Sequence, residues 1–268
     1  FEVRLFEALR RILPAADEEQ SKELGRAFKK RGIAVSAGTP VQSATAEGDA
    51  IRIAYERKGV AESVLVDKLL MAVGVRPNSE GLGLEDAGVE TDGGWVKTDN
   101  CYRTTAPHVY AIGDLIGQPC LAHVASAEGI VAVEHLCGKA VSPIDYDNIP
   151  ACTYCSPQIA SVGLTEMVAR ERYPEVLVGK FPLIANGKAL VLGETGGFVK
   201  AVVDGATGRL LGLHIVGVEA TELLLEFTLG RTVGATAQDL LRSIHPHPTL
   251  GESLHEAVAA ALGEAIHL

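Results

Sequence analysis

The pattern of predicted secondary structure changes near residue 148, and this change constrains the fold more than any other feature of the chain. Before it, strand-like apolar runs alternate with helical patterns and are separated by glycine turns. After it, strand-like runs follow one another before the helices begin, at 159–162, 176–182, 197–203 and 210–216. This order predicts an α/β portion followed by an α+β domain that spans residues 148–268.

The first 76 residues follow the order of strand, helix, small meander and returning strand. A strand is predicted to end at Glu7, and a helix over 17–31 is predicted from Asp17 as its N-cap and Gln20 three residues later. Short strands are predicted around residue 35 and over 41–46, 51–56 and 63–66, with a buried strand over 68–73. We expect residues 1–76 to be the C-terminal part of a Rossmann-like domain. Glu7 at its strand end suits ribose hydroxyls, although a surface carboxylate is the default interpretation.

Residues 77–147 predict part of a second nucleotide-binding domain. A strand is predicted over 108–112, closed by Gly113-Asp114, and a helix over 122–136. Asp114 at a strand end could accept hydrogen bonds from sugar or ribityl hydroxyls, or it could form a simple turn. The free N–H groups of the helix that opens at Leu121-Ala122-His123 would face an electron-rich ring edge, and His123 is expected to contribute its backbone.

An imidazole and a carboxylate lie five residues apart in the segment from His247 to Glu252. A histidine that titrates near neutral pH beside a carboxylate is typical of acid–base chemistry. Glu252 could instead complete a capping box with Thr249, at the start of a helix whose apolar stripe includes Leu250 and Leu254. The residues alone leave these two interpretations about even.

Other reactive side chains have simpler interpretations. Cys152 and Cys155 lack the second pair that a zinc site needs, and they lie between prolines and not at a helix start, so we expect two ordinary buried thiols. His245 and His247 have no third ligand close in sequence. We therefore expect no metal site.

Composition limits the class of partner and compartment. The 268 residues, 47% of them apolar, can bury cores for two or three domains. The net charge of -10 and the lack of a basic run argue against nucleic acid and anionic membranes. Five scattered cysteines, with no membrane span or signal peptide, favour a reducing, cytoplasmic location. The chain begins at Phe1 in a strand-like run, so we expect a fragment of a longer protein.

Several motifs occur in an order that resembles one family. They are Ile112-Gly113-Asp114, Leu121-Ala122-His123, the segment from Pro157 to Glu166, and His247-Pro248-Thr249-Leu250-x-Glu252. The chain is similar from Phe1 to Leu268 to the flavoprotein disulfide reductases, and among them to the dihydrolipoamide dehydrogenases.

The resemblance implies an enzyme that oxidises protein-bound dihydrolipoamide and passes electrons through a disulfide and FAD to NAD. It implies that Asp114 binds the ribityl chain of FAD, and that His247 is the base whose ring Glu252 holds. It also implies flavin-edge contacts by Cys120, Leu121, Ala122 and His123, and NAD contacts by Glu7, Val41 and Gly74. The implied partners are a second subunit, which forms a homodimer through the interface domain and its segment 221–229, and the lipoyl domains and core of a 2-oxo acid dehydrogenase complex or a glycine cleavage system.

The chain departs from the family pattern in several places. The redox Cys-x4-Cys pair and both glycine-rich nucleotide loops are missing, as expected if they precede Phe1. Val75 replaces a common arginine, Pro246 a usual alanine, and Cys155 a histidine or threonine. Mercuric reductase, glutathione reductase and transhydrogenase are the alternative enzymes. Glu7 argues against an NADPH enzyme, and the absence of cysteine after Cys155 argues against mercuric reductase. A non-catalytic dimerisation fragment is the alternative of another class.

Overall fold

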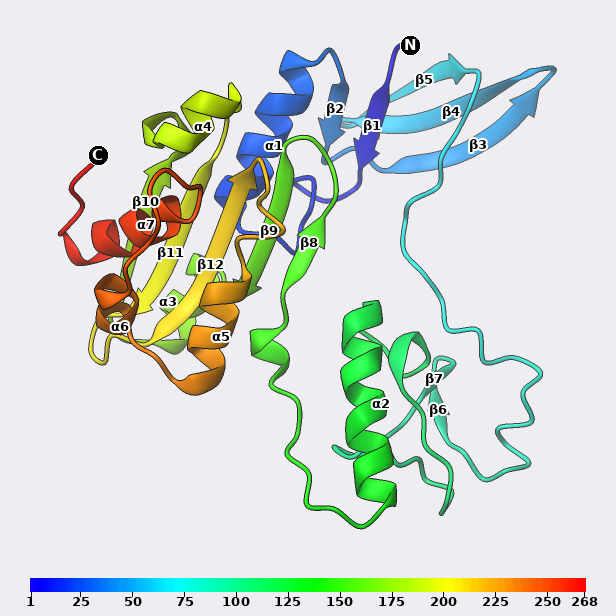
Figure 1. Ribbon diagram of the computed structural model, residues 1–268. Helices are drawn as coiled ribbons and strands as arrows, with labels where there is room; N and C mark the ends of the chain where they lie inside the picture. Colours follow the sequence, from blue (N-terminus) through cyan, green and yellow to red (C-terminus); the bar gives the residue numbers. More distant parts are fainter. The chain divides into compact units, whose positions relative to one another are not determined.

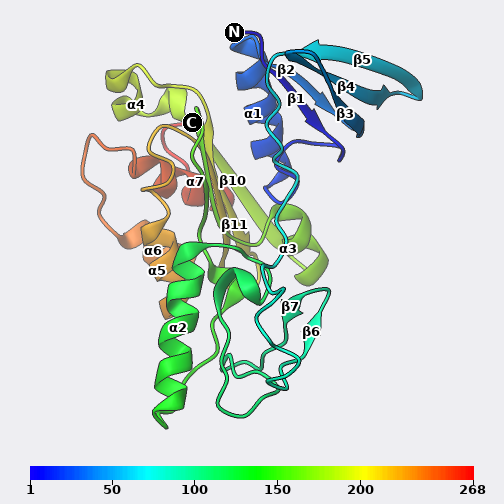
Figure 2. The same cartoon turned by 90° about the vertical axis from the view of Figure 1, so that its right-hand side faces the viewer.

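The computed structural model describes residues 1–268, which form two compact units (Figures 1 and 2). Unit 1 comprises Phe1–Leu69 and Asp147–Leu268, and unit 2 comprises Leu70–Tyr146. The short 3-10 helix η2 (Tyr146–Asn148) lies where unit 2 ends in the sequence. The predicted division into domains at 76/77 and 147/148 stays a prediction.

A five-stranded antiparallel sheet forms the centre of unit 1 (Figure 1). Its strands are β8 (Ala151–Thr153), β9 (Gln158–Gly163), β10 (Val176–Pro182), β11 (Phe198–Asp204) and β12 (Leu210–Gly217), in the order β10-β11-β12-β9-β8. Strands β11 and β12, which follow one another in the sequence, pair as an antiparallel hairpin. Every residue of β11 and β12 is buried, because helices cover both faces of the sheet.

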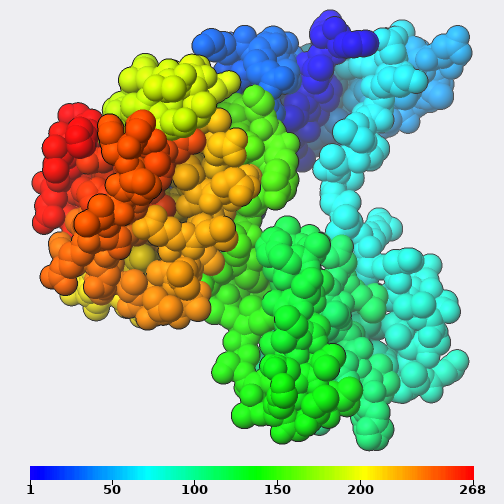
Figure 3. Space-filling model, viewed as in Figure 1, coloured from blue at the N-terminus to red at the C-terminus, as the bar shows by residue number.

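The C-terminal helices cover one face of this sheet. They are α5 (Leu225–Val233), α6 (Ala237–Arg242) and α7 (Glu252–Leu262), and the short helices η3 (Leu183–Ala185) and α4 (Gly187–Leu192) lie at its edge. Leu254 and Val258 of α7 pack with Leu213 and Ile215 of β12 in the main core. These helices form one continuous surface with the C-terminal tail, coloured yellow-green to red in Figure 3.

Helices α1 (Glu18–Lys30) and α3 (Glu166–Arg172) cover the opposite face of the sheet. Leu24 of α1 packs in a second core with Ile159, Phe198 and Val216 of the sheet. The predicted capping box of α1 is confirmed. The side chain of Asp17 accepts hydrogen bonds from backbone N–H groups of the first turn, and the side chain of Gln20 accepts one from the backbone N–H of Asp17. The N-terminal segment is therefore packed onto the C-terminal sheet.

The N-terminal strands agree with the α/β prediction. Strands β1 (Arg4–Glu7) and β2 (Ala34–Ala37) pair in parallel across α1, and β3 (Val41–Glu47), β4 (Ala50–Arg57) and β5 (Val60–Val66) form an antiparallel meander. The strand predicted over 68–73 is wrong. No strand pairs with this apolar run, and its side chains are exposed, with Leu70 at 88%. An apolar run forms a strand only where a neighbouring backbone completes its hydrogen bonds.

Unit 2 has a small core of its own around Val89, Val96 and Ala106. It contains β6 (Thr91–Asp92), β7 (Trp95–Val96), the 3-10 helix η1 (Gly113–Leu115) and α2 (Ala122–Leu136), whose predicted bounds are confirmed. The strand predicted over 108–112 is wrong. Only an isolated bridge joins Arg103 to Tyr110, because His108 adopts a φ of 76°, which ends extended backbone. In neither unit is any helix both long and apolar enough to cross a membrane.

Candidate active site

His247 projects from the turn between α6 and α7. Its side chain is 78% exposed, and its Nδ1 lies 2.8 Å from Oε1 of Glu252. A carboxylate oxygen accepts a hydrogen bond, so Nδ1 carries a proton in this arrangement. The other ring nitrogen, Nε2, forms no hydrogen bond within the chain and is the atom able to take a proton from an outside group.

Glu252 fills both of the roles that the sequence left open. While Oε1 contacts His247, Oε2 accepts a 2.8 Å hydrogen bond from the backbone N–H of Thr249. The capping box is only half formed, because the Thr249 hydroxyl donates to the carbonyl of Pro246. The backbone N–H of Thr249, just before α7, thus fixes the carboxylate while it orients the His247 ring.

The surroundings of Glu252 keep it ionised. Partial burial acts to raise its pKa, but hydrogen bonds from the Thr249 N–H and from His247 outweigh burial and lower the pKa below its ordinary value. An ionised Glu252 can stabilise the imidazolium that forms when His247 takes a proton. The pair is therefore competent for acid–base chemistry.

The predicted apolar stripe holds α7, and hence Glu252, against the sheet. Leu250, Leu254 and Val258 retain at most 8% exposure, and all three belong to the main core. Burial of each such side chain contributes roughly 1.5–3 kcal/mol. The carboxylate that orients His247 therefore projects from a rigid element.

A second histidine and glutamate form the same contact elsewhere on α7. Nδ1 of His267 lies 2.9 Å from Oε1 of Glu256, and the His267 side chain is 69% exposed. Oε2 of Glu256 accepts from the backbone N–H groups of Ile266 and His267. This pair ties the C-terminal tail to α7, so a histidine–glutamate contact is not by itself a catalytic site.

Asp114 lies exposed in η1. Glu128, a residue that sequence reasoning missed, holds this loop in place. Glu128 of α2 is buried at 3% exposure, and its Oε2 accepts a 2.6 Å hydrogen bond from the N–H of Gly113. Its Oε1 accepts from the hydroxyl of Tyr146. The sequence signal was a carboxylate on an otherwise apolar helix face. A side chain at Gly113 would crowd the Cβ of Ala125, at 3.0 Å.

Cys120, Leu121, Ala122 and His123 form the entry to α2. Leu121 is the N-cap residue, no side chain caps the helix, and its first turn contains no acidic residue. Burial and the negative charge of Asp114 raise the pKa of Cys120, so Asp114 lies near this entry. A helix start of this kind attracts an electron-rich or anionic group.

The residues predicted for NAD lie in both units. Glu7 ends the parallel strand β1, where its Oε1 accepts a 2.8 Å hydrogen bond from the N–H of Leu9. Val41 starts β3 and is 45% exposed. Gly74 belongs to unit 2, where its φ of 117° favours glycine.

The two cysteines of the Cys-x-x-Cys segment are free and half-buried. They lie in and just after the edge strand β8, and burial raises the pKa of both thiols. A reactive cysteine needs a lowered pKa, so neither is an activated thiol. Across residues 1–268, no group of three or more histidine, cysteine, aspartate or glutamate side chains could hold a metal ion.

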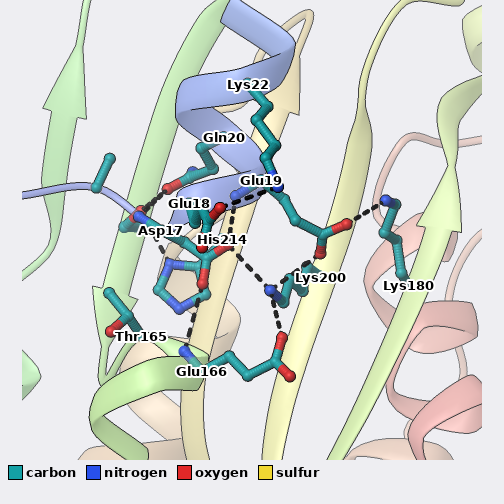
Figure 4. Close-up of polar contacts among 12 residues, drawn as sticks. Asp17, Glu18, Glu19, Gln20, Lys22, Thr165, Glu166, Lys180, Lys200 and His214 are labelled. Carbon is teal, nitrogen blue, oxygen red and sulfur yellow. Dashed lines mark hydrogen bonds and ion pairs between the residues drawn. The ribbon is translucent and has the colours of Figure 1, made fainter. Parts of the chain in front are cut away.

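A polar row that sequence reasoning missed crosses the sheet beneath α1 (Figure 4). Its central members, Lys200 and His214, are buried, and Lys180 on the edge strand β10 is exposed. Lys180, Lys200, His214 and Ser161 stand opposite one another on strands β10, β11, β12 and β9. Nζ of Lys200 lies 3.0 Å from Oδ1 of Asp17, 3.0 Å from Oε2 of Glu19 and 2.7 Å from Oε2 of Glu166.

Every charge in this cluster has a protein partner. Lys180 also pairs with Glu19, and Arg170 pairs with Glu166. Gln20 of α1 donates to the carbonyls of Ala160 and Ile215 on two adjacent strands. Because three carboxylates surround the ammonium group of Lys200, which has three donors, we interpret the cluster as the set of polar contacts that fixes α1 to the sheet.

Two family models match the chain. The model described as "Pyridine nucleotide-disulphide oxidoreductase" matches residues 1–129, and the model for the dimerisation domain of the same group matches residues 149–258.

Curated relatives share the name "Dihydrolipoyl dehydrogenase". The chain is 44% identical to the protein of Zymomonas mobilis over 99% of its own length, and 45% identical to that of Thermus scotoductus over 100%. It spans only 58% of the length of each. Among solved structures, LpdA of Mycobacterium tuberculosis matches 96% of the chain with a TM-score of 0.88 at 29% identity, covering 56% of that protein. The flavoprotein disulfide reductase RclA of Escherichia coli matches 96% with a TM-score of 0.88 at 25% identity, covering 59%.

Proposed function

Because the chain belongs to the pyridine nucleotide-disulphide oxidoreductases, we propose that it is part of an enzyme that oxidises protein-bound dihydrolipoamide with NAD as acceptor. The curated relatives, 44% and 45% identical over nearly the whole chain, carry the name of that activity. The observation that carries the proposal is the exposed His247, whose Nε2 is free while Glu252 holds Nδ1 at 2.8 Å.

In the proposed reaction, Nε2 of His247 takes a proton from a thiol of the dihydrolipoyl group. A thiolate attacks a disulfide and a thiol does not, so this transfer speeds exchange with the enzyme's redox disulfide. The proton stays on the His247 ring, and the carboxylate of Glu252 stabilises the resulting charge. The redox cysteine pair is not among these 268 residues.

Five residues of unit 2 suit FAD. The uncapped start of α2 at Cys120, Leu121, Ala122 and His123 fits the pyrimidine edge of a flavin, and the nearby exposed Asp114 fits the ribityl hydroxyls. When bound, FAD supplies the redox chemistry that no side chain here provides. Glu128 supports this site by holding Gly113.

NAD is the proposed electron acceptor. Glu7 at the end of β1 has the carboxylate that a ribose diol requires, and Val41 offers an exposed apolar surface at the start of β3. The third proposed contact, Gly74, has the backbone freedom that a close approach to a ligand needs.

We further propose that the protein is a cytoplasmic homodimer that serves the lipoyl domains of a 2-oxo acid dehydrogenase complex or a glycine cleavage system. The match of residues 149–258 to a dimerisation domain supports the homodimer. The exposed side chains of Leu225, Leu229 and Val233 on α5 are the surface that we expect a second subunit to cover.

The test uses the full-length protein, purified and analysed for flavin absorbance and for NADH formation with dihydrolipoamide. We expect a bound flavin and dihydrolipoamide-dependent NADH formation. A flavoprotein that instead reduces glutathione disulfide or mercuric ion with NADPH would assign another reductase of the family. A protein with neither flavin nor turnover would support the non-catalytic dimerisation module.

A further inference from the structure

His245 precedes His247 by two residues, but its ring has different surroundings. The His245 side chain is only 10% exposed, against 78% for His247. Nδ1 of His245 lies 3.0 Å from the carbonyl oxygen of Ser243, and Nε2 lies 3.0 and 3.1 Å from the two carboxylate oxygens of Glu226 on α5. Both partners are hydrogen-bond acceptors, so both ring nitrogens of His245 face acceptors within the protein. His245 thus has no nitrogen left to take a proton from a substrate.

The turn that carries His247 has little backbone support. The last backbone hydrogen bond of α6 is donated by the N–H of Ser243. The next backbone hydrogen bond along the chain is the one that the N–H of Ser253 donates to the carbonyl of Leu250. Residues 244–249 form no backbone–backbone hydrogen bond, so side chains hold the turn in place.

Two contacts with other elements hold this turn, one on each side of His247. On one side His245 is bound by Glu226 of α5. On the other, the carbonyl of Thr249 accepts a 3.0 Å hydrogen bond from Nδ2 of Asn186, which is 3% exposed. The turn is therefore fixed at both of its ends.

The His245 ring also packs against α7. It meets the ring of His255 edge to face, with 5.3 Å between the ring centroids. Nε2 of His255 in turn lies 3.3 Å from the carbonyl of Leu241 in α6. A single buried ring thus connects α5 through Glu226, α6 through Ser243 and α7 through His255.

We propose that Glu226 and His245 are a positioning pair that fixes the turn presenting Nε2 of His247. This inference rests on the proposed function, because it assigns the pair to the placement of the base. Misplacement of a reacting group by about 1 Å can reduce a rate by roughly 10²-fold. Glu226 is chosen for the test because it acts from a different helix and forms no contact with His247 itself.

The experiment compares Glu226→Gln and His245→Phe with the control Glu219→Gln in the full-length enzyme. Gln keeps the shape of Glu226 without its charge, and Phe keeps an aromatic ring at position 245 without the two ring nitrogens. Glu219 is an exposed carboxylate outside the turn that forms no ion pair. We expect both test variants to lower kcat for dihydrolipoamide about tenfold or more. Because thiol binding is untouched, KM and FAD content should stay within about twofold.

A crystal structure of each variant supplies a readout that does not depend on activity. We expect the 2.8 Å contact between His247 and Glu252 to be lost or disordered in both test variants and kept in Glu219→Gln. Folded test variants that keep this contact and a kcat within twofold of wild type would overturn the inference. If Glu226→Gln does not fold, Glu226→Asp retains the charge on a shorter side chain, and an unchanged kcat and turn in that variant would overturn it equally. Should the wild-type enzyme fail to oxidise dihydrolipoamide, the proposed function fails, and the crystal structures still decide whether the pair positions the turn.

Discussion

Replacement of Lys200 by methionine should lower the free energy of unfolding by an amount that depends on the carboxylates around Lys200. Three carboxylates surround Nζ of Lys200, but two of them keep another cation, since Glu19 retains Lys180 and Glu166 retains Arg170. Only Asp17, whose side chain is 3% exposed, is left as an unpaired buried charge. Breaking a buried pair in this way costs about 3–5 kcal/mol.

The assay is thermal and urea unfolding of wild type, Lys200→Met, Asp17→Asn and the double variant. For a chain of this size each kcal/mol lowers Tm by about 2–4 °C, so Lys200→Met should lose roughly 6–20 °C. Asparagine remains a good N-cap, so Asp17→Asn keeps the cap of α1. The double variant should lose clearly less than the sum of the single variants, because neutralising Asp17 removes the unpaired charge. A loss below about 1 kcal/mol for Lys200→Met, or an additive double variant, would refute this reasoning.

The same cluster predicts the direction of the acid response. Burial acts to raise the pKa of Asp17, Glu19 and Glu166, but their hydrogen bonds and cationic neighbours outweigh it and lower all three pKa values. Groups with a lowered pKa in the folded protein contribute stability above their unfolded pKa of about 4, and that stability is lost as the pH falls through the folded pKa. Urea unfolding between pH 7 and 2.5 should therefore show wild type losing stability below pH 4 more steeply than Lys200→Met. Parallel curves would contradict this assignment.

Two further substitutions test close contacts elsewhere. Gly179→Ala should abolish stable folding, because the added Cβ would lie 2.0 Å from the carbonyl oxygen of Ala257 on α7. Circular dichroism and thermal melting measure this loss. A native melting curve would show that α7 does not approach β10 so closely. Glu128→Gln in the full-length protein should weaken flavin retention, because the carboxylate holds the N–H of Gly113 at 2.6 Å. Flavin absorbance per subunit after dialysis measures the loss, and full retention would show that Glu128 does not support the proposed flavin site.

Features that depend on local sequence were predictable. A few neighbouring residues determine such features. Examples are the capping box of α1, the bounds of α2 and the first and last residues of β10. The reach of Glu252 to both His247 and the Thr249 N–H is likewise contained in six residues. Such contacts can be predicted from the sequence before any fold is known, because they depend only on short-range geometry.

Features that depend on distant partners were not. The apolar run at 68–73 looked like a strand, but pairing requires a neighbour that spacing does not reveal. Lys200 meets Asp17 across 183 residues of sequence, and Glu226 meets His245 across 19. Nothing in the sequence around these four residues indicates the contacts, because the β-sheet register and the packing of the helices create them.

The proposed role of His247 as the base is tested most directly by dihydrolipoamide turnover of the full-length His247→Gln variant at matched FAD content. The control is His267→Gln, which alters the other exposed histidine–glutamate contact on α7. Loss of a general base should lower kcat by about 10²–10⁴-fold in His247→Gln while FAD stays bound, and His267→Gln should match wild type. Turnover of His247→Gln within a few-fold of wild type would contradict the assignment of its Nε2 as the proton acceptor.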